Sequence, residues 1–150
     1  MKEKEIHFYE REFYMFSNFS SFSVDMDGVQ WPTSEHLYQA MKFMGQDSDI
    51  VAQIKNAPSA HEARQIAKKY PDQVIKDWDT IKVEMMEKII RQKHAQHPYI
   101  QQKLLESMGR ELIEVSPRDS FWGWGPNKDG ENHLGKVWMK VRDEIVKKIK

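Results

Sequence analysis

The sequence contains no cysteine. This absence excludes disulfide bonds, thiolate zinc sites, iron–sulfur clusters and cysteine nucleophiles together. A metal site built on histidine is not supported either. His94 and His97 have the spacing of one helical face, but no glutamate of a zincin pattern and no evident third ligand accompany them. We therefore expect no metal and no cofactor, and any nucleophile must be another type of side chain.

The sequence also lacks a long hydrophobic run. No stretch approaches the ~18 apolar residues that are needed to cross a bilayer. Residues 1–5 carry charges of both signs, and no apolar signal segment follows them. We therefore expect a cytoplasmic protein with no membrane association. The sequence does not indicate an oligomeric state.

An excess of charge of one sign is missing as well. The 23 lysines and arginines balance the 23 aspartates and glutamates. A neutral chain has no global field to hold a nucleic-acid backbone, although a local basic patch would suffice for a single extruded base. A small-molecule partner is therefore favoured.

The length and composition are those of one globular domain. The chain has 150 residues, of which 39% are apolar and 31% are charged. It is long enough to bury a core and too rich in core-forming residues to be disordered. We predict a single domain over residues 1–150.

Local patterns predict a hairpin and then a helix in the first third of the chain. Apolar and polar residues alternate over residues 22–26 and again over residues 29–31. Asp27-Gly28 between them suits the positive φ angles of a tight hairpin turn. Thr33 is a good N-cap, and residues 34–44 contain neither glycine nor proline. We predict a helix that begins after Thr33.

Helical periodicity dominates the rest of the chain. The predicted helices cover residues 50–54, residues 58–67, a long segment capped by Asp79 or Thr80, residues 98–108 and the segment after Asn132, and a short strand covers residues 111–115. The predicted fold class is α+β, a mainly helical single domain with a small antiparallel sheet.

Three segments break the pattern that packing alone would produce. The first covers residues 16–22, where small polar side chains such as Ser17 and Asn18 alternate with aromatic ones such as Phe19. Such a segment can hold a planar ring and hydrogen-bond its edges. The alternative is an ordinary loop anchored by its aromatic side chains.

The second segment is the helix that follows Thr33. Glu35 lies in its first turn, where the helix dipole favours the anion and depresses the pKa of the carboxyl. Glu35, Gln39 and Lys42 are spaced four and then three residues apart, so that a carboxylate, an amide and an amine share one helical face. The alternative is an ordinary helix start with a solvated lysine.

The third segment, residues 118–135, has two tryptophans among four glycines and leads into a helix. Such rings stack on a base, and glycines let backbone N–H groups approach a phosphate at a helix N-terminus. The segment matches neither the dinucleotide fingerprint nor the phosphate-binding loop with its Lys-Ser/Thr pair. Asp119 is a candidate second carboxylate, and its alternative role is to cap the following turn.

Taken together, these blocks resemble the NADAR or YbiA-like family over nearly the whole chain. The resemblance is carried by Phe16-Ser17-Asn18-Phe19, by Trp31-Pro32-Thr33-Ser34-Glu35-His36-Leu37-Tyr38-Gln39-Ala40-Met41-Lys42-Phe43, by Phe121-Trp122-Gly123, by Asn132 and by Leu134-Gly135. The central block is long and chemically unusual, and the order and spacing of the blocks agree with the family.

The resemblance implies an α+β fold and an N-glycosidase that hydrolyses a ribose C1–N bond. The implied substrates are phosphoribosylamino-pyrimidine intermediates of riboflavin biosynthesis. The alternative substrate is ADP-ribose attached to guanine, which is the only form in which we expect a nucleic-acid partner. Together with the local chemistry, the family pattern predicts substrate contacts at Ser17, Asn18, Phe19, Trp31, His36, Trp78, Trp122, Gly123, Gly125, Asn132 and Gly135.

Cleavage of a C–N bond leaves an oxocarbenium-like ribose, which a fixed carboxylate such as Glu35 stabilises. Alternatively, Lys42 attacks the anomeric carbon and forms a Schiff base, provided that burial or a neighbouring cation lowers its pKa from about 10.4. Both routes remain open. Asp119 is the expected acid or base at the leaving group, with Trp78 and Trp122 closing over the base.

Two other functional classes use the same residues. A non-catalytic sensor of ADP-ribose or NAD-derived ligands would need the aromatic loop without turnover, although it has no need of a charged pair at the sugar. A structural or interaction domain would instead place its tryptophans in the core.

Overall fold

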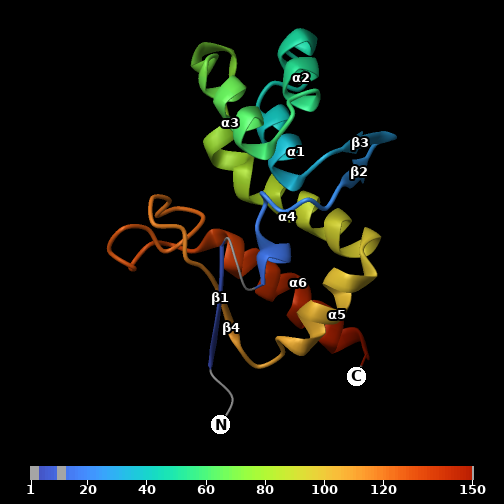
Figure 1. Ribbon diagram of the computed structural model, residues 1–150, viewed down its shortest axis with the longest axis vertical. Coiled ribbons are helices and arrows are strands. Elements are labelled where there is room, and N and C mark those ends of the chain that lie inside the picture. The colour runs from blue at the N-terminus through green and yellow to red at the C-terminus, as the bar shows by residue number, and fades with distance from the viewer. Residues whose placement is uncertain (1–3, 10–12, 150) are drawn as a thin grey trace. The chain divides into compact units, whose positions relative to one another are not determined.

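The computed structural model of the chain describes residues 4–9 and 13–149 (Figure 1). Residues 1–3 of the charged N-terminal segment lie outside the described residues. The fold is α+β and mainly helical with a small antiparallel sheet, as predicted. The chain divides into two compact units, a middle unit of residues 18–96 and a terminal unit of residues 1–17 and 97–150. The single domain stays a prediction.

The middle unit begins with the predicted hairpin. β2 (Val24–Met26) and β3 (Val29–Trp31) are antiparallel, and Val24 lies opposite Trp31. Asp27 and Gly28 have φ angles of 52° and 81°, as a tight turn between two twisted strands requires.

Helices make up the rest of the middle unit. They are α1 (Ser34–Met41), α2 (Ser48–Lys55), α3 (Ala60–Lys68) and α4 (Trp78–Gln96), with a short 3-10 helix at Pro71–Gln73. α1 packs against the other three (Figure 1), and all eight of its residues are buried. Because this helix has solvent on no side, its polar side chains must find partners inside the protein or in a ligand.

Several helix ends differ from the prediction by one to three residues, and the hydrogen bonds explain two of these differences. α1 ends at Met41 instead of Met44, because the chain tightens after it and Phe43 N donates to Ala40 O over 3.0 Å. α4 begins at Trp78, before both predicted caps, because the carbonyl of Asp77 already accepts hydrogen bonds from the N–H groups of residues 80 and 81.

The terminal unit contains a strand pair that the sequence patterns did not reveal. β1 (Glu5–Phe8) pairs in parallel with the predicted strand β4 (Glu111–Glu114), so that Ile6 lies opposite Leu112 (Figure 1). The other elements of this unit are a 3-10 helix at Tyr14–Phe16, α5 (Pro98–Glu106) and α6 (His133–Ile149). α6 packs on β4.

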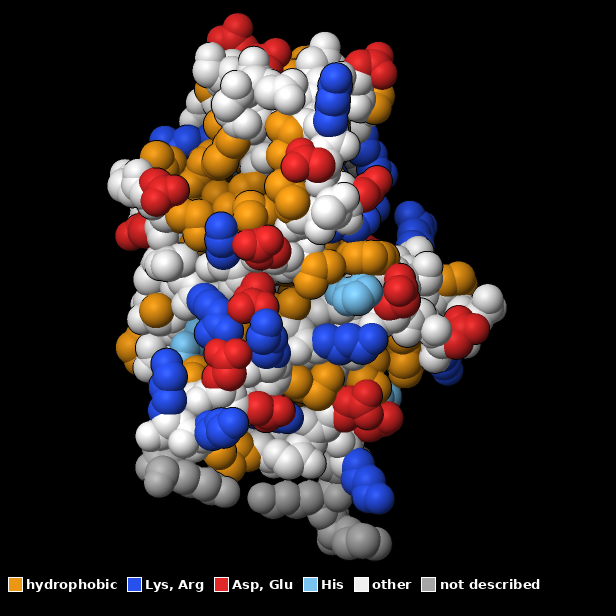
Figure 2. Space-filling model, turned by 180° about the vertical axis from the view of Figure 1, so that it is seen from behind, with side chains coloured by type: hydrophobic (Ala, Val, Ile, Leu, Met, Phe, Trp, Pro, Cys, Tyr) orange, Lys and Arg blue, Asp and Glu red, His pale blue; other side chains and the backbone are white. Residues whose placement is uncertain are grey.

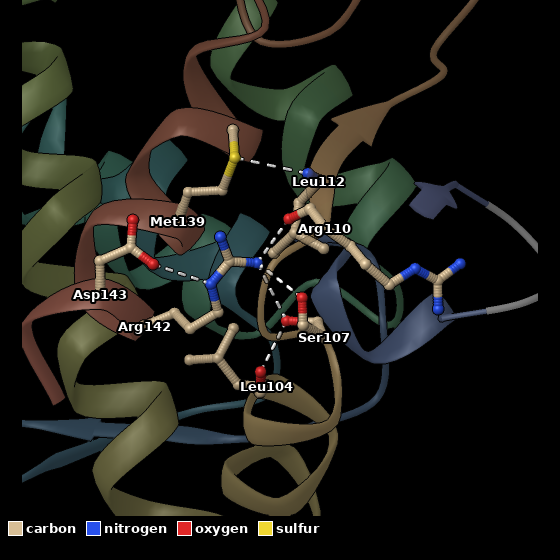
Figure 3. A network of polar contacts seen from close by, with 7 residues as sticks. All are labelled: Leu104, Ser107, Arg110, Leu112, Met139, Arg142 and Asp143. Atoms are coloured by element: carbon tan, nitrogen blue, oxygen red, sulfur yellow. Dashed lines mark hydrogen bonds and ion pairs between the residues drawn. The ribbon is translucent and has the colours of Figure 1, made fainter. Parts of the chain in front are cut away.

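An arginine of α6 closes the end of α5. The Arg142 guanidinium is buried, and its Nη1 donates to Ser107 O over 2.9 Å and to the Arg110 carbonyl over 2.6 Å, while Nε donates to Asp143 (Figure 3). The last carbonyls of a helix have no partner within the helix. Arg142 supplies such a partner and thereby joins α6 to the turn that leads into β4.

The surface carries charges of both signs. Figure 2 shows basic and acidic side chains interspersed on the face that it displays, as the neutral composition leads one to expect. Across the described ranges, none of the helices combines the length and the apolar character that crossing a membrane requires.

A buried lysine of α4 holds the segment of residues 18–23, which leads into the hairpin. Lys93 of α4 donates from Nζ to Ser20 Oγ over 3.0 Å, and both side chains have an exposed fraction of 0%. Nζ also lies 5.9 Å from the centre of the Phe22 ring. Burial lowers the pKa of Lys93 to about 7.

This pKa predicts a pH-dependent stability. Between about pH 7 and 10, the unfolded chain holds a proton on Lys93 that the folded chain has released, so folding becomes more favourable as the pH rises. Relative to Lys93→Met, the free energy of unfolding of the unmodified chain should rise across this window by at most about 1.4 kcal/mol per pH unit. Urea unfolding at several pH values measures it.

The exposed Lys88 on the same helix provides a matched control. The difference between Lys88→Met and the unmodified chain should not depend on pH. A difference for Lys93→Met that is equally constant from pH 7 to 10 would contradict the prediction.

Candidate functional site

The candidate site is built on the polar side chains of α1. Ser34, Glu35, His36 and Gln39 have exposed fractions of 0%, 5%, 1% and 4%. Burying a charged or polar side chain is unfavourable unless hydrogen bonds replace those to water. Their partners therefore distinguish side chains that hold the fold from side chains that are available to a ligand.

His36 holds the fold. Thr33 Oγ1 accepts from the backbone N–H of His36 over 3.1 Å, and the same hydroxyl lies 2.8 Å from Nδ1 of the ring. The other ring nitrogen, Nε2, lies 3.0 Å from the carbonyl oxygen of Ala57, which can only accept. His36 therefore donates from Nε2, accepts at Nδ1 and locks the start of α1 to the loop after α2.

Glu35 and Gln39 are joined directly. Gln39 Nε2 donates to Glu35 Oε2 over 2.7 Å, one helical turn apart. An ionised carboxylate only accepts hydrogen bonds, so the amide nitrogen of Gln39 must face it. This contact favours the charged form of the carboxylate and orients it.

The segment that starts at Asn18 lies against the same turn of α1. The backbone N–H of Glu35 donates to Asn18 O over 3.0 Å, and Asn18 Nδ2 contacts the sulfur of Met86 at 3.4 Å. Asn18 therefore lies beside the turn of α1 that carries Glu35, and the contribution of residues 16–22 to a ligand site stays a prediction.

Three buried oxygens of this region have no hydrogen-bond partner among the described residues. They are Asn18 Oδ1, Ser34 Oγ and Gln39 Oε1. Leaving a buried polar atom without a partner costs about 1–3 kcal/mol. Such atoms are rare in folded proteins, and ordered water, an ion or a ligand usually supplies the missing partner. The three oxygens make this turn of α1 the strongest candidate for ligand contact.

Lys42 follows directly after α1 and is half-buried. Burial lowers its pKa, Arg64 and Lys82 lower it further, and the opposing effects of Glu35 and Asp79 do not cancel these contributions. The Schiff-base route requires that burial or a neighbouring cation lowers the pKa of Lys42, and both effects act in that direction. The electrostatic interaction with Glu35 also means that the two charged groups lie within range of each other.

Aromatic rings stand beside Lys42. Its Nζ lies 5.4 Å from the centre of the Tyr38 ring, and the buried Trp78 ring lies 5.4 Å from Tyr38 at an angle of 56°. Trp78 and Lys42 therefore both lie against Tyr38, and the predicted contact of Trp78 with the base stays a prediction. Trp31 is buried opposite Val24 in the hairpin, and Phe19 is half-buried.

In the terminal unit, Asp119 has a local role. Its Oδ1 accepts from the N–H groups of Phe121 and Trp122 over 3.0 and 2.8 Å. This is the capping of the following turn that stood as the alternative to an acid or base. Trp122 is half-buried and packs edge-on against Phe121, with ring centres 4.9 Å apart.

Asn132 and Gly135 join α6 to β4. Asn132 Nδ2 donates to Leu112 O and Oδ1 accepts from Glu114 N, each over 2.9 Å, so both ends of the amide are used. A Cβ on Gly135 would collide with the carbonyl oxygen of Leu112. The glycine therefore permits the close approach of the helix to the strand.

Backbone groups of the terminal unit pack closely against the glycine-rich loop and accept hydrogen bonds from it. A Cβ on Gly123 would lie 2.7 Å from Glu114 O, and Gly125 has a φ of 71° and donates to Ser116 O. At the start of α6, the N–H groups of His133 and Leu134 donate to loop carbonyls over 3.0 Å. Two of the donors that were expected for a phosphate are thus already engaged.

The structure therefore groups the predicted residues into two sets. The middle unit brings Glu35, Lys42, Asn18 and Trp78 together around α1, whereas Ser17, Asp119 and Trp122 belong to the terminal unit with the loop glycines and Asn132. Sequence reasoning missed Ser34, Tyr38, Arg64 and Lys82. Tyr38 could have been predicted, because it lies at helical spacing from Glu35 and Lys42. No local pattern predicts Arg64 or Lys82, which come from α3 and α4.

The chain is similar to known proteins over most of its length. The NADAR domain matches residues 7–146. An N-glycosidase of Nostoc punctiforme is 41% identical over 143 residues, which cover 93% of this chain and 92% of that protein. The chloroplastic riboflavin biosynthesis protein PYRR of Zea mays is 42% identical over 144 residues, which cover 87% of this chain but only 23% of that longer protein.

The fold is also found in a solved structure. The NMR structure of YbiA from Escherichia coli matches with a TM-score of 0.88 at 31% identity, covering all of this chain and 90% of that one. This match confirms the predicted α+β fold.

Proposed function

We propose that this chain, which belongs to the NADAR family and is an N-glycosidase, hydrolyses the ribose C1–N bond of phosphoribosylamino-pyrimidine intermediates of riboflavin biosynthesis. The proposed reaction takes place in the cytoplasm. The name of the maize relative supports this substrate class. The proposed substrate is a small molecule that carries a sugar, a phosphate and an aminopyrimidine. Each of these parts requires its own binding residues in the site.

The pair of charged groups at α1 carries the proposal. Glu35 is a buried carboxylate held by Gln39, and Lys42 is an amine whose pKa burial lowers. A protein that only binds its ligand has no need to bury a carboxylate beside such an amine. A reaction that develops positive charge on a ribose carbon does need it.

In the first route, the C1–N bond breaks and its electron pair leaves with the nitrogen, which takes a proton from an acid or from water. Glu35 stabilises the oxocarbenium-like carbon. Water then adds to C1 and releases a proton, which yields ribose 5-phosphate and the free aminopyrimidine. The buried carboxylate suits this role because little water screens its charge.

In the second route, neutral Lys42 attacks C1 and the nitrogen leaves with the bonding pair and a proton. The sugar opens into a Schiff base with the lysine, and water hydrolyses it to free sugar phosphate and the original amine. The lowered pKa of Lys42 increases the fraction of the nucleophilic form. The two routes differ in whether a covalent intermediate forms.

The phosphate needs positive charge near the sugar. Arg64 of α3 and Lys82 of α4 act on Lys42 electrostatically, and Lys82 pairs with the exposed Asp79 over 3.2 Å. We assign these two cations to attraction of the phosphate. The roles predicted from the sequence for the terminal unit, Asp119 as acid or base and Trp122 as a platform for the base, stay predictions.

Product analysis tests the proposed substrate. The protein is incubated separately with the phosphoribosylamino-pyrimidine and with ADP-ribosylated guanosine, and the products are identified by mass spectrometry. We expect ribose 5-phosphate and the aminopyrimidine from the first. Guanosine and ADP-ribose from the second alone would replace the assigned substrate by the alternative. A change in tryptophan fluorescence with ADP-ribose but no product from either would indicate a sensor.

Replacing Glu35 tests the carboxylate. Glu35→Gln keeps the shape and an oxygen that can accept from Gln39 but removes the charge. We expect kcat to fall by about 100- to 1,000-fold with little change in binding, because only the transition state needs the charge. The matched control is Glu84→Gln at an exposed position of α4. A kcat like that of the unmodified chain in Glu35→Gln would remove Glu35 from the chemistry.

Trapping with borohydride separates the two routes. If a Schiff base forms, reduction in the presence of substrate adds the mass of the reduced sugar phosphate to the peptide that contains Lys42. Lys55→Met, which changes an exposed lysine of α2, should leave the adduct intact, and Lys42→Ala should abolish it. The second route is wrong if no adduct forms and Lys42→Ala keeps its rate.

A further inference from the structure

The two ends of the Gln39 amide are in different situations. Nε2 donates to Glu35 Oε2 over 2.7 Å, whereas Oε1 has no hydrogen-bond partner among the described residues. The amide cannot be turned around to help Oε1, because an oxygen would then face the carboxylate. The contact with Glu35 therefore leaves a buried acceptor without a partner among the described residues.

The position of this acceptor follows from the position of the carboxylate. Oε1 and Nε2 are bonded to the same carbon, so Oε1 lies close to the group that Glu35 contacts. On the proposed function, that group is the anomeric carbon of a ribose. Among the hydroxyls of the ribosyl group, the one on C2 lies closest to this carbon, and hydrogen bonds to the 2-hydroxyl strengthen in glycosidic transition states.

We infer that Gln39 Oε1 accepts a hydrogen bond from the 2-hydroxyl of the ribosyl substrate while Nε2 positions Glu35. This role rests on the proposed function and adds to it a residue that selects ribose over 2-deoxyribose. Because Oε1 is closed to solvent in the ligand-free chain, the side chains around it shift when the sugar binds.

Binding of two sugar phosphates tests this role. Titration calorimetry compares ribose 5-phosphate with 2-deoxyribose 5-phosphate, which differ only in the 2-hydroxyl. The unmodified chain should bind the first about tenfold more tightly, because the second leaves the buried acceptor unpaired. Gln39→Met, which has a similar length and no amide, should bind both with equal affinity.

The matched control is Gln65→Met at an exposed position of α3. It should keep the preference of the unmodified chain. The role is overturned if Gln39→Met keeps that preference. It is also overturned if the unmodified chain binds both sugar phosphates equally or binds neither, and these results do not depend on how the variant folds.

The pH dependence of kcat separates positioning of Glu35 from a purely structural role of Gln39, because a structural role would leave it unchanged. In Gln39→Met, the carboxylate loses a hydrogen bond that favours its charged form, so the acidic limb of the profile of kcat against pH should move to higher pH. Lys42, which interacts with Glu35, and Arg64, Lys82 and Asp79, which interact with Lys42, are the same in both proteins. An unmoved limb would contradict the positioning of Glu35.

Failure of this role and failure of the proposed function are distinguishable. Turnover of the phosphoribosylamino-pyrimidine without any preference for ribose would leave the function intact and remove Gln39 from recognition. A preference for ribose that depends on Gln39, without turnover, would support the recognition and contradict the function.

Discussion

The candidate site of the middle unit depends on the hydrogen bond between Gln39 and the buried carboxyl group of Glu35. Glu35 is 5% exposed on a helix that is buried on all sides, and the Gln39 side chain donates a hydrogen bond to it. Burying a charge without such a donor would favour its neutral form. α1 places the amide of Gln39 one turn away, where it donates to Glu35, and Thr33 and His36 fix the start of the helix by hydrogen bonds of their own.

The same burial acts on the amine at the other end of α1. Removing Lys42 from water lowers its pKa, and cations from two further helices reinforce the effect while Glu35 opposes it. A carboxylate that favours charge and an amine that loses it suit the breaking of a bond to a sugar carbon. Both roles derive from the packing of α1 against α2, α3 and α4.

The loop before α6 shows why composition alone cannot assign a role. Asp119, Asn132 and the loop glycines have the residue types of a ligand site, yet the structure places them against backbone groups of the protein itself. A capping aspartate and a catalytic one are identical in sequence. The buried oxygens of Asn18, Ser34 and Gln39 indicate a ligand site more clearly than the loop does, because they have no hydrogen-bond partner among the described residues.

Turns, caps and helical spacing depend on residues close together in the chain. The hairpin at Asp27-Gly28, the N-cap at Thr33 and the face that Glu35 shares with Gln39 and Lys42 could therefore be predicted from the sequence, as could the family. The pairing of β1 with β4, the structural role of His36 and the oxygen of Gln39 without a partner appear only in the folded chain. These facts depend on burial and on partners distant in sequence, which no local pattern encodes.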